Sequence, residues 1–131
     1  MKYKIIVDTS AWIEYFKNNI TYVKFIEENL YIDSIFITGP IISELIQGTK
    51  TEKELDLLLD SIKAVPYMEC NYNDWVTAGQ LSFTLRKNSK IIPLTDLLIA
   101  VIALKNDAKV LTLDNHFKEI PKIKLIELSA L

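Results

Sequence analysis

The feature that most constrains the fold is a short run of β-branched residues that stops abruptly at an acid. Ile5, Ile6 and Val7 are followed by Asp8, two hydroxyl residues and an apolar, aromatic stretch. Uninterrupted β-branched residues favour a parallel strand covered on both faces, because a strand with one wet face alternates apolar and polar residues. The run therefore predicts a buried strand that leads directly into a helix beginning near Ala11, with Asp8 or a following hydroxyl as its cap.

Strands and helices alternate along the rest of the sequence. Further strands are predicted at Ser34–Thr38, around Ala64–Pro66, at Val110–Leu113 and at Lys124–Glu127. Helices are predicted at Tyr22–Asn29, from Pro40 to Gly48, over Thr51–Ile62, at Asp74–Lys87 with Asn73 as cap, and after Pro93. This alternation predicts parallel crossovers and a three-layer α/β/α fold with a central parallel sheet. We expect residues 1–131 to form a single domain, because no repeat or linker interrupts the pattern.

The composition restricts the chemistry that the chain can perform. Cys70 is the only cysteine, which excludes an internal disulfide and a thiolate metal cluster. His116 is the only histidine, which excludes paired-imidazole catalysis and a multi-histidine zinc site, so we assign it no essential proton transfer. Any catalysis must therefore depend on carboxylates.

The bulk properties predict a globular cytoplasmic protein. The first residues lack the apolar run and cleavage site of a signal peptide, and no apolar run approaches the ~20 residues of a membrane helix. The formal net charge of −2 provides no global attraction to nucleic acid. An anionic partner would need local basic groups or bound metal ions.

Four acids occupy positions that a parallel sheet would bring together. Asp8 and Asp114 follow predicted strands, Asp96 begins a helix, and Glu44 lies within a helix between apolar neighbours. Helix capping or a turn explains each aspartate separately, and Glu44 alone is compatible with a solvated position. In an open parallel sheet, however, ligands bind beyond the carboxyl ends of the strands. The joint placement predicts a carboxylate cluster at that edge.

Such a cluster needs a counter-charge, because each carboxylate raises the pKa of its neighbours. Oxygen ligands favour Mg²⁺ or Mn²⁺. The usual role of a hard cation in such a site is phosphoryl chemistry, in which the metal activates water, screens the phosphodiester and stabilises the leaving oxygen. The pattern thus indicates a metal-dependent nuclease.

Four short motifs make the comparison specific. "VDTSAW", the acid of "PIISEL", "TDLLIA" and "LTLDNHF" occur in the order found in the PIN-domain family, and between Ile5 and about Glu127 the chain resembles its VapC-type toxins. The resemblance implies that the catalytic, metal-binding acids are Asp8, Glu44, Asp96 and Asp114. It places three hydroxyls near the site, as supporting or capping groups, at Thr9, Ser10 and Thr112. Where some relatives carry a further acid, this chain has Asn115 and His116.

The resemblance also implies an activity and partners. It implies an endoribonuclease that uses Mg²⁺ or Mn²⁺, cleaves structured RNA such as tRNA or rRNA, forms a homodimer and is inhibited by a cognate antitoxin. Five basic residues have two alternative interpretations, either as contacts to RNA phosphates or as simply solvated side chains. They are Lys17, Lys24, Arg86, Lys87 and Lys90. Five aromatic residues also have two alternative interpretations: they pack in the core, or some of them form a groove that binds an amphipathic antitoxin segment. They are Trp12, Tyr15, Phe16, Tyr22 and Phe25.

Two other classes remain open at this point. A phosphatase with an aspartyl nucleophile would suit Asp8 at a strand end, but the haloacid-dehalogenase-like pattern expects an acid where this chain has Ser10. A non-catalytic RNA-binding module is the alternative outside the enzymes. The presence of all four acids argues against it.

Overall fold

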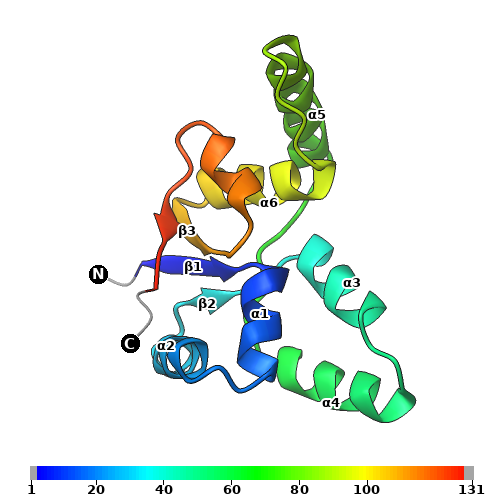
Figure 1. Ribbon diagram of the computed structural model, residues 1–131, viewed down its shortest axis with the longest axis vertical. Helices are drawn as coiled ribbons and strands as arrows, with labels where there is room; N and C mark the ends of the chain where they lie inside the picture. Colours follow the sequence, from blue (N-terminus) through cyan, green and yellow to red (C-terminus); the bar gives the residue numbers. More distant parts are fainter. Residues whose placement is uncertain (1–2, 129–131) are drawn as a thin grey trace.

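The computed structural model describes residues 3–128, in which a parallel four-stranded sheet forms the centre of the fold (Figure 1). The strand order is β2-β1-β3-β4, and every neighbouring pair is parallel. The strands are β1 (Lys4–Val7), β2 (Ile35–Phe36), β3 (Ala108–Leu111) and β4 (Leu125–Ile126). Ile6 pairs with Phe36 on one side and with Val110 on the other. The first strand is therefore the internal strand that its β-branched sequence predicts.

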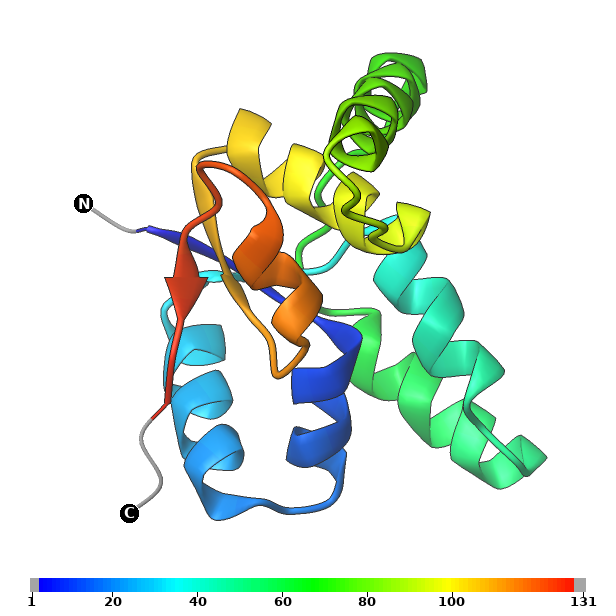
Figure 2. The ribbon, with the colours of Figure 1, turned by 45° about the horizontal axis from the view of Figure 1, so that its top comes forward.

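Helices cover both faces of the sheet. Helices α1 and α2 lie on one side, and α6, with α5 stacked on it, lies on the other (Figures 1 and 2). The helices are α1 (Thr9–Phe16), α2 (Ile20–Tyr31), α3 (Gly39–Gln47), α4 (Glu52–Ile62), α5 (Tyr72–Lys87) and α6 (Leu94–Lys105), followed by the 3₁₀ turn η1 (Asn115–Glu119). The predicted three-layer α/β/α architecture with a parallel sheet is confirmed.

Helix α6 is the most deeply buried helix. All residues from 96 to 103 are buried, which agrees with a helix that is apolar on every side and packed between other elements. It packs against α5, β3, α3 and η1. Within residues 3–128, no helix combines the length and apolarity required to cross a bilayer. Helix α6 is instead a rigid internal support that holds Asp96 in its first turn.

The prediction of a strand around Ala64–Pro66 is wrong. The chain makes only an isolated bridge between Ile37 and Tyr67. The Ile37 N–H donates to the Pro66 carbonyl at 2.9 Å, and the Met68 N–H donates to the Ile37 carbonyl at 2.8 Å. A longer ladder is prevented because proline has no N–H to donate.

Several predicted boundaries also need correction. Helix α2 covers Ile20–Tyr31 rather than Tyr22–Asn29. Helix α5 is capped by Asn71 rather than by Asn73, since the Asn71 side chain accepts from the Asp74 N–H and Asp74 accepts from the Asn71 N–H. Strand β3 covers Ala108–Leu111 rather than Val110–Leu113. Beyond Leu111 the chain turns, and its polar groups bond to side chains of the candidate site instead of to a neighbouring strand.

Asp74 connects the two helices on the α6 side of the sheet. Its buried carboxylate accepts from Lys105 Nζ at 2.7 Å as well as from the Asn71 N–H at 2.9 Å. Burial alone would raise the pKa of Asp74, but the hydrogen bonds from Lys105 and Asn71 and the Lys105 charge together hold it below its usual range. The ionised form therefore stabilises the α5–α6 pair.

We expect Asp74→Ala to lower the free energy of unfolding by about 2 kcal/mol at neutral pH, because it removes both the capping box and the charged hydrogen bond. The loss should shrink as the pH falls towards the Asp74 pKa, since the wild-type carboxylate is then protonated. Urea denaturation at several pH values measures this. Asp60, in an exposed ion pair with Lys63, provides the control: Asp60→Ala should change stability by less than about 0.5 kcal/mol. Equal effects of both substitutions would contradict the role given to Asp74.

Candidate active site

The backbone of Asp8 begins helix α1, but its side chain does not cap the helix. The buried carboxylate makes no capping hydrogen bond. Its Oδ2 atom instead accepts from Thr112 Oγ1 at 2.8 Å and from Ser10 Oγ at 3.0 Å. The Asp8 N–H donates to the Leu111 carbonyl at 2.9 Å, which fixes the end of β1 against the end of β3. The simple capping explanation of this carboxylate is therefore wrong.

Hydroxyl groups join the first turn of α1 to the segment after β3. Ser10 Oγ lies 3.2 Å from Thr112 Oγ1 and accepts from the Leu113 N–H at 3.0 Å. Thr112 Oγ1 also accepts from the Asp114 N–H at 2.9 Å. Because one hydroxyl can donate and accept, these two side chains orient Asp8 and also hold the backbone that carries Asp114.

Glu44 approaches the same edge of the sheet from α3. Its Oε1 atom accepts from Thr9 Oγ1 at 3.0 Å, so the helix after β1 also positions a carboxylate on a neighbouring helix. Burial raises the pKa of Glu44, the Thr9 hydrogen bond partly opposes this, and the charges of Asp8 and Asp114 raise it further. A fully solvated position for Glu44 is therefore not supported. The side chain is half-buried, and the charges of two other predicted acids raise its pKa.

Asp96 completes the group from the first turn of α6. Its carboxylate is buried, and burial together with the charges of Asp114 and Asp8 raises its pKa to about 7, although contact with His116 opposes the shift. Each predicted acid thus interacts electrostatically with at least one of the others. The structure brings all four to the carboxyl edge of the parallel sheet.

The sequence analysis did not place His116 in this group. Its Nδ1 atom lies 3.0 Å from Asp114 Oδ1 and 3.3 Å from Asp96 Oδ2. Asp114 also caps η1 by accepting from the His116 N–H at 2.9 Å. The available signal was the spacing, because a tight turn after Asp114 directs the residue two positions later back towards the capping carboxylate.

This donor set suits a divalent cation. Ligand atoms of Asp96, Asp114 and His116 lie within 4.8 Å of one another, and two further carboxylates, from Asp8 and Glu44, act on the same region. Carboxylate oxygens are preferred ligands of Mg²⁺ and Mn²⁺, and a cation would remove the repulsion that raises these pKa values. The chemistry of the residues therefore fits the predicted type of ion.

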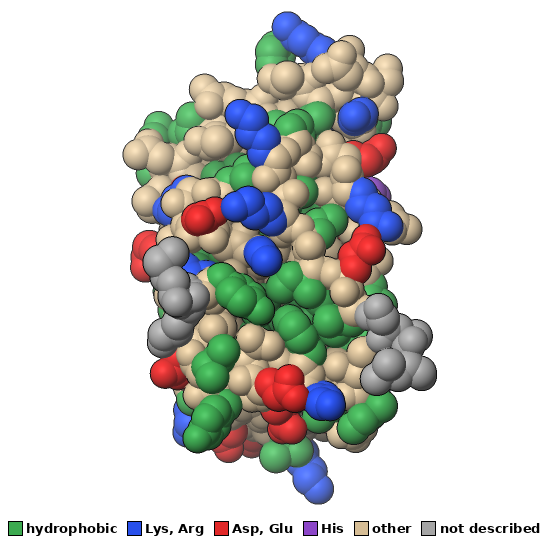
Figure 3. All heavy atoms as spheres, turned by 90° about the vertical axis from the view of Figure 1, so that its left-hand side faces the viewer, with side chains coloured by type: hydrophobic (Ala, Val, Ile, Leu, Met, Phe, Trp, Pro, Cys, Tyr) green, Lys and Arg blue, Asp and Glu red, His purple; other side chains and the backbone are tan. Residues whose placement is uncertain are grey.

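The basic residues considered from the sequence all lie on the surface of the described part of the chain. Figure 3 shows Lys and Arg scattered among acidic and apolar side chains on the face that it displays. Lys17 pairs with Glu14 at 4.0 Å, and Lys87 Nζ lies 4.5 Å from the centre of the Phe83 ring. The side chains of Lys24, Arg86 and Lys90 are exposed. Phosphate contact by any of these residues stays a prediction.

Fold and site together define a parallel α/β protein with an acidic centre of the nuclease type, and comparisons with known proteins agree. A model of the PIN domain family matches residues 5–123. VapC ribonuclease Mb1587 from Mycobacterium bovis and Ribonuclease VapC11 from Mycobacterium tuberculosis are each 25% identical over 126 residues, covering 91% of this chain and 92% of theirs. The chain belongs to the PIN domain family, which confirms the resemblance based on its motifs.

Solved structures show the same fold. The VapBC2 structure from Rickettsia felis matches with a TM-score of 0.80 and 22% identity, covering 95% of this chain and 98% of that one. VapBC from Salmonella typhimurium matches with a TM-score of 0.78 and 20% identity, covering 95% and 97%. FitAcB from Neisseria gonorrhoeae gives 0.73 and 15%, covering 94% and 96%. These matches extend over nearly the whole length of each chain.

The raised pKa of Asp96 predicts a pH-dependent stability in the absence of metal. The folded protein keeps the Asp96 proton up to about pH 7, whereas the unfolded chain releases it near its ordinary value of 3.8, so stability should fall as the pH rises between these values. Asp96→Asn should flatten this slope and raise the melting temperature above pH 7 in EDTA. Thermal melts at several pH values measure the effect. Asp56→Asn, at an exposed position of α4, is the matched control, and equal responses of the two variants would contradict the assignment.

Proposed function

We propose that this protein is a Mg²⁺- or Mn²⁺-dependent endoribonuclease and the toxin of a VapBC-type pair. The main support is the convergence of Asp8, Glu44, Asp96 and Asp114 on one edge of a PIN-domain sheet. Curated relatives named as VapC ribonucleases support RNA as the substrate, with tRNA or rRNA as the candidates. We further propose that residues 1–131 act as one domain in the cytoplasm.

The chain's own residues explain how such a site would be organised. Asp8, Glu44, Asp96 and Asp114 would hold the metal, which on binding would activate water and screen the phosphodiester charge. Ser10 and Thr112 keep Asp8 in one orientation, and Thr9 does the same for Glu44. The buried helix α6 fixes Asp96. The residues therefore provide a preorganised acidic cradle, so that little side-chain ordering is needed when substrate binds.

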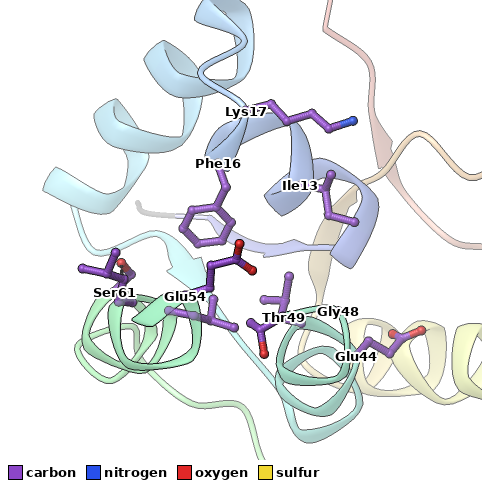
Figure 4. A pocket seen from close by; sticks show the side chains of 11 residues that line it. Ile13, Phe16, Lys17, Glu44, Gly48, Thr49, Glu54 and Ser61 are labelled. Atoms are coloured by element: carbon purple, nitrogen blue, oxygen red, sulfur yellow. Dashed lines mark hydrogen bonds between the residues drawn. The ribbon is translucent and has the colours of Figure 1, made fainter. Parts of the chain in front are cut away.

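An apolar groove beside the site supports an antitoxin as the protein partner. A cavity of about 640 Å³ lies between α1, α3 and α4 (Figure 4). Phe16 points into it from α1, and Leu57 and Leu58 line it from α4. Glu44 belongs both to this groove and to the acidic site. An apolar antitoxin segment in the groove would therefore lie next to the proposed catalytic carboxylates. Proteins of similar structure include a toxin–antitoxin complex from Klebsiella pneumoniae.

Of the five aromatic residues considered from the sequence, only Phe16 lines this groove. Trp12 is buried, Tyr15 and Phe25 pack against the core, and Tyr22 lines a different cavity next to Asp114. The groove is instead completed by α3 and α4, which the sequence analysis did not connect with a partner.

A homodimer remains part of the proposal. Its support is the family resemblance, together with exposed apolar residues along α5, namely Tyr72, Trp75, Val76 and Phe83. Such residues are unusual on a helix that has no partner on that face. Sedimentation analysis of the purified protein would measure the oligomeric state directly.

For the enzymatic activity, we expect RNA cleavage that stops in excess EDTA and returns with Mn²⁺ or Mg²⁺. Because water is the nucleophile in metal-assisted hydrolysis, the products should carry 5′-phosphate and 3′-hydroxyl ends, and a 2′-deoxy substitution at the cut site should leave the reaction possible. Asp8→Asn and Asp96→Asn should each reduce the rate by at least about tenfold. Asp60→Asn removes an exposed acid of the same charge and is the control. Cyclic-phosphate ends formed in EDTA, or RNA binding without cleavage under all conditions, would overturn the proposal.

For the partner, we expect Leu57→Glu to weaken binding of the cognate antitoxin by at least about tenfold, because it places a charge in the apolar groove. Leu57 is 59% exposed, so the substitution should leave the fold intact. RNA cleavage by the free variant should persist while its inhibition is lost. The control is Leu104→Glu, at an exposed apolar position of α6 outside the groove. Calorimetric titration measures both affinities, and unchanged binding by Leu57→Glu would place the partner elsewhere.

A further inference from the structure

The imidazole of His116 is turned into the acidic site although the side chain begins at an exposed turn. Its Nδ1 atom lies 3.0 Å from an oxygen of Asp114 and 3.3 Å from an oxygen of Asp96. The side chain is 46% exposed, so solvent is available to it, yet the nitrogen faces two carboxylates from different elements.

The turn that carries His116 restricts where the ring can lie. Its N–H donates to Asp114 Oδ1 at 2.9 Å, which fixes the backbone against the acid that the ring also contacts. The next residue, Phe117, is completely buried and anchors η1 in the core. The position of the imidazole is therefore determined by a capping bond on one side and by a buried aromatic ring on the other.

The spacing of these three atoms is that of ligands sharing one ion. Neighbouring ligands of an octahedral ion with bonds of about 2.1 Å lie roughly 3 Å apart, which follows from the right angle between them. The distances from Nδ1 to the two carboxylate oxygens fall at this spacing, and all three donor atoms lie within 4.8 Å of one another.

We infer that His116 is a nitrogen ligand of the divalent ion and that it biases the site towards Mn²⁺ over Mg²⁺. The inference rests on the proposed metal-dependent function, and it adds a residue that the acidic motifs do not include. A site made only of oxygen ligands suits Mg²⁺. Transition-metal ions such as Mn²⁺ bind imidazole nitrogen more strongly than Mg²⁺ does. A nitrogen donor added to a site otherwise made of oxygen atoms therefore increases the preference for Mn²⁺.

A different role for His116 would leave a different signature. If the ring only supplied positive charge to the empty acidic cluster, an entering cation would displace it, and Mg²⁺ and Mn²⁺ would be affected alike. If the ring binds the ion, loss of the nitrogen should weaken Mn²⁺ binding selectively. The ratio of the two affinities separates these roles.

The experiment measures Mn²⁺ and Mg²⁺ binding by calorimetry in the wild type and in His116→Gln, without RNA. We expect the Mn²⁺ dissociation constant to rise by at least about tenfold in the variant, and the Mg²⁺ constant to change by less than about threefold. Electron spin-echo spectroscopy of Mn²⁺ bound to the wild type should show coupling to a directly bound nitrogen. This coupling should be absent in His116→Gln.

The control is Asn115→Ala, which alters the exposed neighbour in the same turn and should preserve both the affinities and the nitrogen signal. Equal changes in Mn²⁺ and Mg²⁺ affinity, or Mn²⁺ bound to the wild type without nitrogen coupling, would overturn the role of His116 while the acidic site stands. Failure of the wild type to bind either ion would overturn both this inference and the proposed metal-dependent function.

Discussion

The fold brings several carboxylates close together at one edge of a largely buried sheet, and their mutual repulsion is the constraint on which the site depends. Asp96 shows this most clearly, because burial and the charges of Asp114 and Asp8 raise its pKa to about 7. Such an arrangement opposes folding unless protons, donors or cations compensate for it. The surrounding residues provide compensation in two forms, namely hydroxyl donors and the His116 imidazole.

The hydroxyl groups connect elements that are distant in sequence. Thr112 and Ser10 both donate to Asp8, although 104 residues separate Thr112 from Asp8. Thr9 donates to Glu44 across a separation of 35 residues. These bonds hold the ends of β1 and β3 and helix α3 in a fixed relation. The same donors that reduce repulsion therefore also define the geometry in which a cation or a phosphate would be received.

Sequence reasoning predicted the fold well where the pattern reflects burial. The run Ile5–Val7 predicts an internal parallel strand, and the apolar helix after Pro93 predicts a packed internal helix, because both are dictated by the removal of apolar surface from water. The proximity of the motif acids also agrees with their sequence positions, since Asp8 and Asp114 follow strands, Asp96 is in the first turn of α6 and Glu44 lies within α3. Their role as metal ligands stays a prediction. The wrong strand around Ala64–Pro66 has a local cause, because an apolar run suits a strand only where its N–H groups can pair, and Pro66 has none.

Side-chain direction was the part that the sequence pattern did not determine. A strand-end aspartate before a helix is compatible with capping, and only the contacts of Asp8 with Thr112 and Ser10 show that its carboxylate faces the site instead. His116 illustrates the same limit, since its sequence position two residues after Asp114 fits a solvated turn equally well. Its orientation follows from the capping bond to Asp114 and from the burial of Phe117, which are tertiary features. A single histidine in a sequence excludes multi-histidine chemistry, but it does not exclude one imidazole placed among carboxylates, where it changes the character of the whole site.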